Sequence, residues 1–186
     1  MTSQILRFVF LISLLTNFTT LNASVYDDDV LEIFSKILPR FVLMDNQKTT
    51  LKDEIDICVL HNLVDERSAL SLIDKINNNY PNGLKNYKIK FTHDNYSNIA
   101  ACQDSQLIFL FNSSDKEIAD ALLFAKKQKS LTVSYDDALL SRGVEISLFL
   151  GRKIVPYINI KALQKNGMEM DNLLLRISKI YIEMDK

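Results

Sequence analysis

Histidine and cysteine, two residue types that often carry catalysis, are scarce in this chain of 186 residues. It holds two histidines, His61 and His93, and two cysteines, of which Cys58 lies inside an apolar run that is typical of a core strand. The motifs Gly-x-Ser-x-Gly, His-Glu-x-x-His and Gly-x-Gly-x-x-Gly do not occur, so hydrolases, zinc proteases and dinucleotide-binding enzymes lack their minimum parts. We predict that the protein is not an enzyme and that it uses no cofactor and no metal ion.

Five polar residues follow two of the apolar runs and are the candidates for a ligand site. They are His61 and Asn62 after residues 55–60, and Asn112, Ser113 and Ser114 after residues 107–111. Ligands of doubly wound sheets bind at the carboxyl ends of strands, and a helix that begins at Ser114 can receive an anion. Asn and Ser are also ordinary turn and cap residues, and this second interpretation is favoured. Neither run ends in the acidic residues that a receiver-type phosphoacceptor site needs.

The apolar pattern predicts helices that begin at well-defined caps. The first is expected from Asp27 onward and should end or kink near Pro39, because proline cannot donate a helical hydrogen bond. Asp65 is expected to cap the second helix. Ser114 and Glu117 form a capping box that opens the third. Helices therefore alternate with the strand-like runs, which implies a mainly parallel sheet covered on both faces.

The strand-like runs also predict the strand order. Residues 55–60 and 107–111 are apolar on both faces and are expected at the centre of the sheet. Residues 87–92 alternate between apolar residues and residues such as Lys88 and Lys90, which places that strand at an edge. The resulting order, second-first-third-fourth, is that of the flavodoxin-like doubly wound α/β folds.

The last third of the chain predicts an antiparallel addition to this sheet. Residues 144–150 and 154–158 are joined by too few residues for a crossover, so they should form a hairpin. Pro156 cannot donate a ladder hydrogen bond, which places the second hairpin strand at the opposite edge. Asn159 is expected to cap a short helix that Gly167 ends. A final helix, capped by Asp171, is expected to bury Leu174, Ile177 and Tyr181.

The N-terminus has the features of a secretory signal peptide. Arg7 is the only charged side chain among the first 26 residues, residues 8–15 are almost wholly apolar, and a polar stretch ends in Ala23 and Ser24. This apolar core is shorter than the roughly 20 residues of a spanning helix. We predict cleavage between Ala23 and Ser24 and export to the periplasm. An uncleaved membrane anchor is the alternative.

Composition limits what the exported part can be. Residues 24–186 have the size of a single α/β domain, and 47% of the whole chain is hydrophobic, which supplies one core. The formal net charge of −1 argues against a nucleic-acid partner, which would require a basic stripe.

The order of the pieces in the last third resembles the YfiR family of periplasmic proteins. The matching pieces are the strand Leu131-Thr132-Val133-Ser134, the segment Gly143-Val144-Glu145-Ile146, the hairpin, the pair Ile158-Asn159, Gly167, and the run Leu174-Leu175-Arg176-Ile177. Val144 and Pro156 stand where that family usually has a second glycine and a phenylalanine, so the chain resembles a divergent member.

The resemblance implies a regulatory function. Family members are exported proteins, and the best understood type holds a membrane-bound diguanylate cyclase inactive by binding its periplasmic portion, which lowers cyclic di-GMP and biofilm formation. Others occur with sensor histidine kinases, so the alternative is a periplasmic module that binds a small ligand and works with such a kinase. Homodimer formation is left open by the sequence.

The resemblance also raises the question of a disulfide between Cys58 and Cys102. Members often carry cysteines in or near the strands that correspond to residues 55–60 and 107–111, and export permits the bond. The expected geometry argues against it, because Cys58 is in mid-strand while Cys102 is placed in a helical turn at the far end of the neighbouring strand. Cysteines whose α-carbons are more than about 7 Å apart cannot be bridged. The pairing stays open.

Six cations are candidates for a partner surface. They are Arg40, Arg142, Arg152, Lys153, Arg176 and Lys179. Surface charges are more often solvated or locally paired, and that interpretation is favoured.

Overall fold

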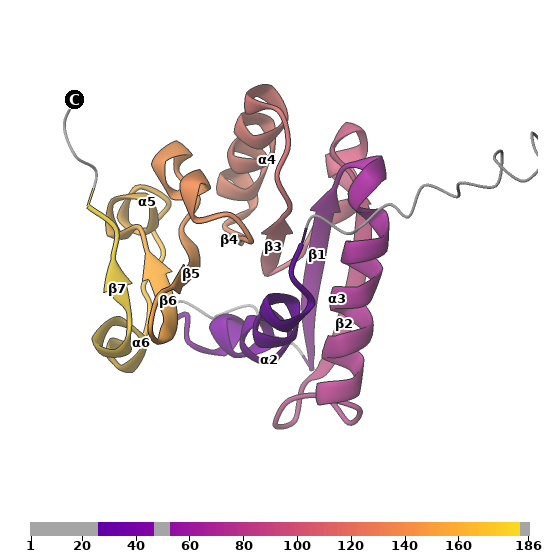
Figure 1. Ribbon diagram of the computed structural model, residues 1–186, viewed down its shortest axis with the longest axis horizontal. Helices are drawn as coiled ribbons and strands as arrows, with labels where there is room; N and C mark the ends of the chain where they lie inside the picture. Colours follow the sequence, from indigo (N-terminus) through magenta and orange to yellow (C-terminus); the bar gives the residue numbers. More distant parts are fainter. Residues whose placement is uncertain (1–25, 47–52, 183–186) are drawn as a thin grey trace, which may run out of the picture.

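A seven-stranded sheet forms the centre of the part of the chain that the structure describes, residues 26–46 and 53–182 (Figure 1). The structure is a computed structural model. The predicted signal peptide, residues 1–23, and its cleavage site at Ala23 and Ser24 lie outside the described residues.

The sheet has the order β2-β1-β3-β4-β5-β6-β7. Its strands are β1 (Glu54–His61), β2 (Lys88–Asn95), β3 (Leu107–Leu110), β4 (Leu131–Ser134), β5 (Ile146–Leu150), β6 (Ile154–Ile158) and β7 (Lys179–Ile180). All neighbouring strands are parallel except β5 and β6, which form the antiparallel hairpin. The predicted α/β fold and the flavodoxin-like order of its first four strands are confirmed.

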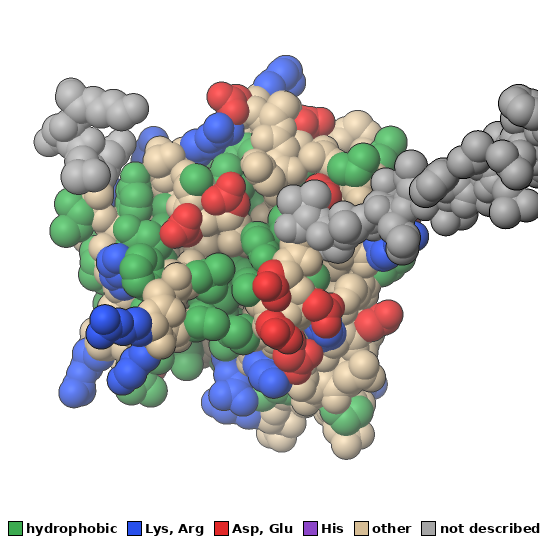
Figure 2. All heavy atoms as spheres, in the orientation of Figure 1, with side chains coloured by type: hydrophobic (Ala, Val, Ile, Leu, Met, Phe, Trp, Pro, Cys, Tyr) green, Lys and Arg blue, Asp and Glu red, His purple; other side chains and the backbone are tan. Residues whose placement is uncertain are grey.

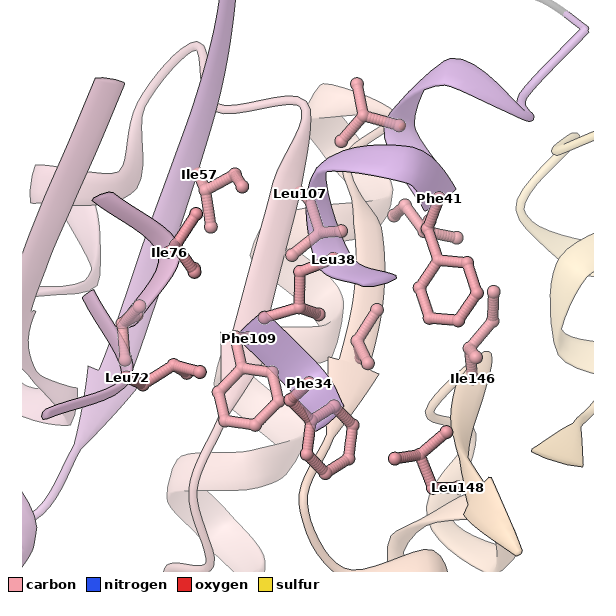
Figure 3. Packing of buried hydrophobic residues seen from close by; sticks show 14 of the residues in the cluster. Phe34, Leu38, Phe41, Ile57, Leu72, Ile76, Leu107, Phe109, Ile146 and Leu148 are labelled. Atoms are coloured by element: carbon pink, nitrogen blue, oxygen red, sulfur yellow. The ribbon is translucent and has the colours of Figure 1, made fainter. Parts of the chain in front are cut away.

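Helices cover both faces of the sheet. They are α2 (Asp28–Leu43), α3 (Glu66–Asn79), α4 (Asp115–Gln128), α5 (Ile160–Lys165) and α6 (Asn172–Ile177), with the 3-10 segments η1 (Leu63–Asp65), η2 (Tyr96–Cys102) and η3 (Asp137–Arg142). One core cluster lies between the sheet and α2 and α3, where Phe34 and Leu38 meet Phe109 (Figure 3). A second cluster, on the other face, includes residues of η2, α4 and η3.

The edge position predicted for the second strand is confirmed at β2. Its side chains alternate between half-buried and exposed, and it pairs only with β1. Lys90 of β2 forms a salt bridge with Glu54, which keeps its ammonium group at the surface. β2 and β7 lie at opposite ends of the sheet (Figure 1). The charged residues of β2 are thus accommodated without burial.

The first two helices differ in detail from the prediction. Of the two outcomes predicted at Pro39, an end or a kink, the end is wrong: α2 continues to Leu43, because Phe41 and Val42 in its last turn are buried in the core and stabilise helix beyond the proline. Asp65 precedes α3 as expected, but its side chain makes no capping hydrogen bond there. It accepts a hydrogen bond from the Tyr26 hydroxyl at 3.3 Å instead.

The C-terminal edge also differs from the prediction. β6 is not an edge strand, since β7 pairs with it at Tyr157 and Ile158, beyond Pro156. Pro156 lacks a backbone donor, but the pairing begins only at the next residue, Tyr157. At its end, Tyr181 N donates to Ile158 O at 2.8 Å. α6 ends at Ile177, which is exposed, so that of the three residues predicted to be buried by this helix only Leu174 is.

Candidate functional site

The structure brings the five candidate residues for a ligand site together at the carboxyl ends of β1 and β3, and we call them the lip: His61, Asn62, Asn112, Ser113 and Ser114. Asn62 Nδ2 donates to the Asn112 carbonyl at 2.9 Å, and Ser113 Oγ lies 3.0 Å from Asn62 Oδ1. His61 is buried, and its ring stacks on that of His93 with 5.7 Å between the ring centroids. These side chains bind one another across the switch point of the sheet.

A carboxylate occupies the place where an anion would bind. Ser114 forms the predicted capping box with Glu117, and Ser113 Oγ also donates to Glu117 Oε2 at 2.5 Å. The hydrogen bonds from Ser113 and then Ser114 lower the pKa of Glu117. A negative charge therefore already satisfies the N-terminus of α4. This arrangement favours the turn-and-cap interpretation of the lip over an anion site.

Cys58 and Cys102 form a disulfide with 5.3 Å between their α-carbons. The expectation that Cys102 would lie too far away is wrong. η2 follows β2 and packs back over β1 and β2, so its last residue, Cys102, lies above the middle of β1 rather than beyond its end. The bond joins two segments of the second core cluster.

Residues in the last third of the chain form a buried polar network around Glu145. Its side chain is fully buried, and Oε2 accepts hydrogen bonds from Thr132 N at 2.6 Å and Thr132 Oγ1 at 2.9 Å. Oε1 accepts from Asn166 Nδ2 at 2.7 Å. Burial raises the pKa of Glu145 to about 7, although these hydrogen bonds act in the opposite direction. Sequence reasoning missed this residue, although a lone charge between apolar Val144 and Ile146 was a signal for it.

Asn159 extends the network to the next helix. Its backbone nitrogen donates to the Glu145 carbonyl at 2.8 Å, and its Nδ2 donates to the Leu140 carbonyl at 2.8 Å. Its Oδ1 accepts from Ala162 N at 3.0 Å, which is the predicted cap of α5. The side chain of Asn159 thus fixes η3 relative to α5, and its backbone connects both to the residue before β5.

A groove lies above this network, between α4, η3 and α5, and encloses about 520 Å³. The buried stripe of α4 is Ile118, Ala121 and Ala125, which leaves Leu122 and Leu123 on the groove side. We call this feature the α4–α5 groove. Its cationic residues are Lys126, Arg142, Lys161 and Lys165. Since Asn159 and Asn166 also line the groove, the Glu145 network supports one of its walls.

Arg142 is locally paired within this groove. Its guanidinium forms a salt bridge with Asp115 at the start of α4. Arg40, another of the six candidate cations, donates through Nε to the Tyr80 hydroxyl at 3.0 Å. The other four lie near the β5–β6 hairpin and α6, so the structure does not gather the six predicted cations into one surface.

A second groove of about 360 Å³ opens where β4 and β5 separate. These strands pair only at Val133 and Ile146, and beyond that point Tyr135 and Phe149 line opposite sides of the opening. Tyr26 packs edge-on against Tyr135 with 4.6 Å between ring centroids. Burial raises the pKa of Tyr26 to about 12. Of the predicted lip residues, Asn112 lines this groove.

The described ranges 26–46 and 53–182 contain neither a metal site nor a membrane-spanning helix. There, no three His, Cys, Asp or Glu side chains gather in a way that would hold a metal ion. In the same ranges, no helix has the length and hydropathy needed to cross a bilayer.

Solved structures share this fold. A conserved domain protein from Vibrio cholerae superposes with a TM-score of 0.55 at 12% identity, covering 81% of this chain and 59% of its own. An ABC domain from Streptococcus pneumonia, solved in complex with L-Trp, gives a TM-score of 0.53 at 9% identity, with 83% and 61% covered. The chain thus spans about three fifths of the length of either structure. At these identities the likeness shows the fold alone.

Sequence comparison gives a more specific result. No curated protein sequence matches the chain. A family model described as YfiR/HmsC-like matches residues 34–179, which runs from α2 to β7 and includes the whole Glu145 network and the α4–α5 groove.

Proposed function

The chain belongs to the YfiR/HmsC-like family, and from this membership we propose that it is an exported regulator that binds the periplasmic part of a membrane signalling protein. The partner we propose is a diguanylate cyclase, which the bound regulator holds inactive so that cyclic di-GMP stays low. The match over residues 34–179 is the observation that carries the proposal. The signal-peptide pattern of residues 1–23 supports the location.

The α4–α5 groove is the surface we propose for the partner. Leu123 is 55% exposed, and Lys126 and Lys165 line the groove together with it. A groove lined by leucines and lysines is complementary to an amphipathic helix that carries acidic residues beside its apolar stripe. The periplasmic portion of the partner would supply such a helix.

Repression follows if the regulator prefers one conformation of the partner. A ligand shifts a two-state equilibrium only by its difference in affinity for the two states. A hundredfold preference for the inactive state corresponds to about 2.7 kcal/mol, which would shift a balanced equilibrium to about 99% inactive partner. The regulator needs no catalytic group for this effect.

The proposal is tested in a strain that lacks the gene. Deletion should raise cyclic di-GMP and surface attachment, and the wild-type gene should restore both to the parental level. L123E in the α4–α5 groove should fail to restore them, because a carboxylate would face the acidic helix of the partner. L70E is the matched control, since Leu70 is an exposed leucine on α3, away from the groove.

Each outcome decides between functions. Equal complementation by both variants would show that the partner binds to another surface of the protein. Unchanged cyclic di-GMP in the deletion strain, with the protein detected in the parent, would reject the cyclase as the partner.

The second groove favours one alternative function. Its volume of about 360 Å³ and its lining by Tyr26, Tyr135 and Phe149 fall within the range of small-ligand sites. The chain would then be a ligand-binding sensor module that works with a sensor histidine kinase. Loss of kinase-dependent transcription in the deletion strain, without a change in cyclic di-GMP, would support this function.

A further inference from the structure

The end of the β5–β6 hairpin exposes apolar side chains together with those of α6. The exposed residues are Leu150, Ile154, Leu173 and Ile177, each between 42% and 57% accessible. Leu150 and Ile154 are direct partners in the antiparallel ladder, so they lie on the same face of the hairpin. α6 packs on that face, because Leu174 belongs to the same core cluster as Leu148, which lies two residues before Leu150 in β5 and therefore faces the same side. We call these four residues, with the turn between the strands, the hairpin end.

Cations alternate with these apolar residues. Arg152 and Lys153 form the turn, Arg176 lies between Leu173 and Ile177 on α6, and all three are exposed. Within the described residues, none of the three takes part in a salt bridge. Lys and Arg side chains gather over the hairpin and α6 at the lower left of Figure 2.

We propose that the hairpin end docks on an anionic phospholipid surface. Aliphatic side chains beside Lys and Arg suit the boundary between headgroups and acyl chains, where the cations meet lipid phosphates. A protein partner is the less favourable occupant, since charged residues are depleted from the centres of protein interfaces. Here the cations stand between the apolar residues.

The hairpin end is separate from the α4–α5 groove. α5 begins two residues after β6 ends, while the turn precedes β6, so the length of this five-residue strand, about 13 Å, lies between the two surfaces. Membrane docking and partner binding can therefore occur together, and the docking proposal does not depend on a cyclase partner.

Vesicle binding tests the proposal directly. The protein, with its N-terminus determined by mass spectrometry, is sedimented with vesicles of phosphatidylcholine alone or with phosphatidylglycerol added. We expect at least tenfold tighter binding to the anionic vesicles and a marked loss of binding in 0.5 M salt. R152Q/K153Q should bind about 30-fold more weakly, since each cation near an anionic surface contributes roughly a fivefold gain.

Two further variants separate the hairpin end from general charge and from misfolding. K126Q/K165Q removes two cations from the α4–α5 groove and should change vesicle binding less than threefold. L173S/I177S should weaken the binding that remains in high salt, while L123S, also at an exposed leucine, should not. Thermal unfolding shows whether each variant is folded.

Several results would overturn the proposal. Equal binding to neutral and anionic vesicles would exclude recognition of the anionic surface. Equal losses in R152Q/K153Q and K126Q/K165Q would show a general charge effect. Unchanged vesicle binding by R152Q/K153Q, together with loss of repression in cells, would make the hairpin end a protein interface instead.

Discussion

Glu145 lies in the segment that resembles the YfiR family, and its role in this fold is structural. Its carboxyl group has no exposed surface, and its acceptor atoms are bound by Thr132 and Asn166. Together with Asn159 it joins β4, η3 and α5 through side-chain hydrogen bonds. Replacing one partner in a buried network leaves the others unsatisfied, which costs more than the bond itself. Glu145 and Asn159 therefore hold one wall of the α4–α5 groove in place.

The raised pKa of Glu145 predicts a pH dependence of stability. Between its ordinary value of 4.5 and about 7, the folded protein keeps this proton while the unfolded chain releases it. The free energy of unfolding should therefore fall as pH rises through this range. The contribution of Glu145 between pH 5 and pH 8 is about 2 to 3 kcal/mol.

The variant E145Q should remove that contribution, because a neutral amide can still accept from Thr132 while Asn166 turns its own amide. Urea unfolding at pH 5 and pH 8 measures the difference. E169Q is the control, since Glu169 is exposed and should keep the wild-type difference. If E145Q also keeps it, Glu145 is ionised in the fold over this whole range.

At the scale of elements, η2 is held to the sheet by a covalent bond. Cys102 ends η2 and Cys58 lies within β1, 44 positions earlier in the chain. Tyr96 at the start of η2 is buried as well, and its hydroxyl donates to the Phe111 carbonyl. Both ends of this short segment are thus anchored to central strands, which explains how an irregular segment forms part of a core.

Loss of the disulfide should destabilise the protein. Opening a loop of this length lowers the free energy of unfolding by about 2 to 4 kcal/mol, mainly because the unfolded chain gains freedom. We expect C58A/C102A to show this loss in urea unfolding, and the wild-type protein in reductant to match it closely. The comparison with reduced wild type separates the bond from the smaller side chains. Wild-type stability that reductant does not change would contradict the prediction.

At the scale of the whole molecule, three surfaces have different characters. The lip at the switch point is joined by its own hydrogen bonds, the α4–α5 groove is lined by both leucines and lysines, and the hairpin end exposes apolar side chains beside cations. The switch point, where doubly wound folds usually bind ligands, is therefore occupied by polar groups of the chain itself. The two surfaces that we propose for binding include residues of η3, α5, α6 and the β5–β6 hairpin.

Export should be required for function. A protein without residues 1–23 should fold but fail to lower cyclic di-GMP, because it cannot reach the periplasmic part of its partner. Fusion of residues 24–186 to the signal peptide of an unrelated exported protein should restore repression. Both proteins are assayed in the deletion strain, with their amounts measured by immunoblot. Full repression by the protein without a signal peptide would place its action in the cytoplasm.

The sequence by itself determined most of the sheet. The difference between the doubly apolar runs and the lysine-bearing β2 decided which strands are central, because an unpaired charge cannot be buried without a large cost. The short turn after Leu150 decided the hairpin, and the capping box decided where α4 begins. Each of these signals is local, since a few neighbouring residues contain it completely.

Only the tertiary structure decided how distant segments meet. The path of η2 brought Cys102 to Cys58, and the burial of Phe41 continued α2 past Pro39. Partners of Glu145 come from β4 and from the residue after α5, so its role could not be seen in its own segment. The same holds for the two proposed surfaces, each of which is formed by residues of several separate elements. Periodicity reports which side of an element is buried, but packing among all the elements decides what it is buried against.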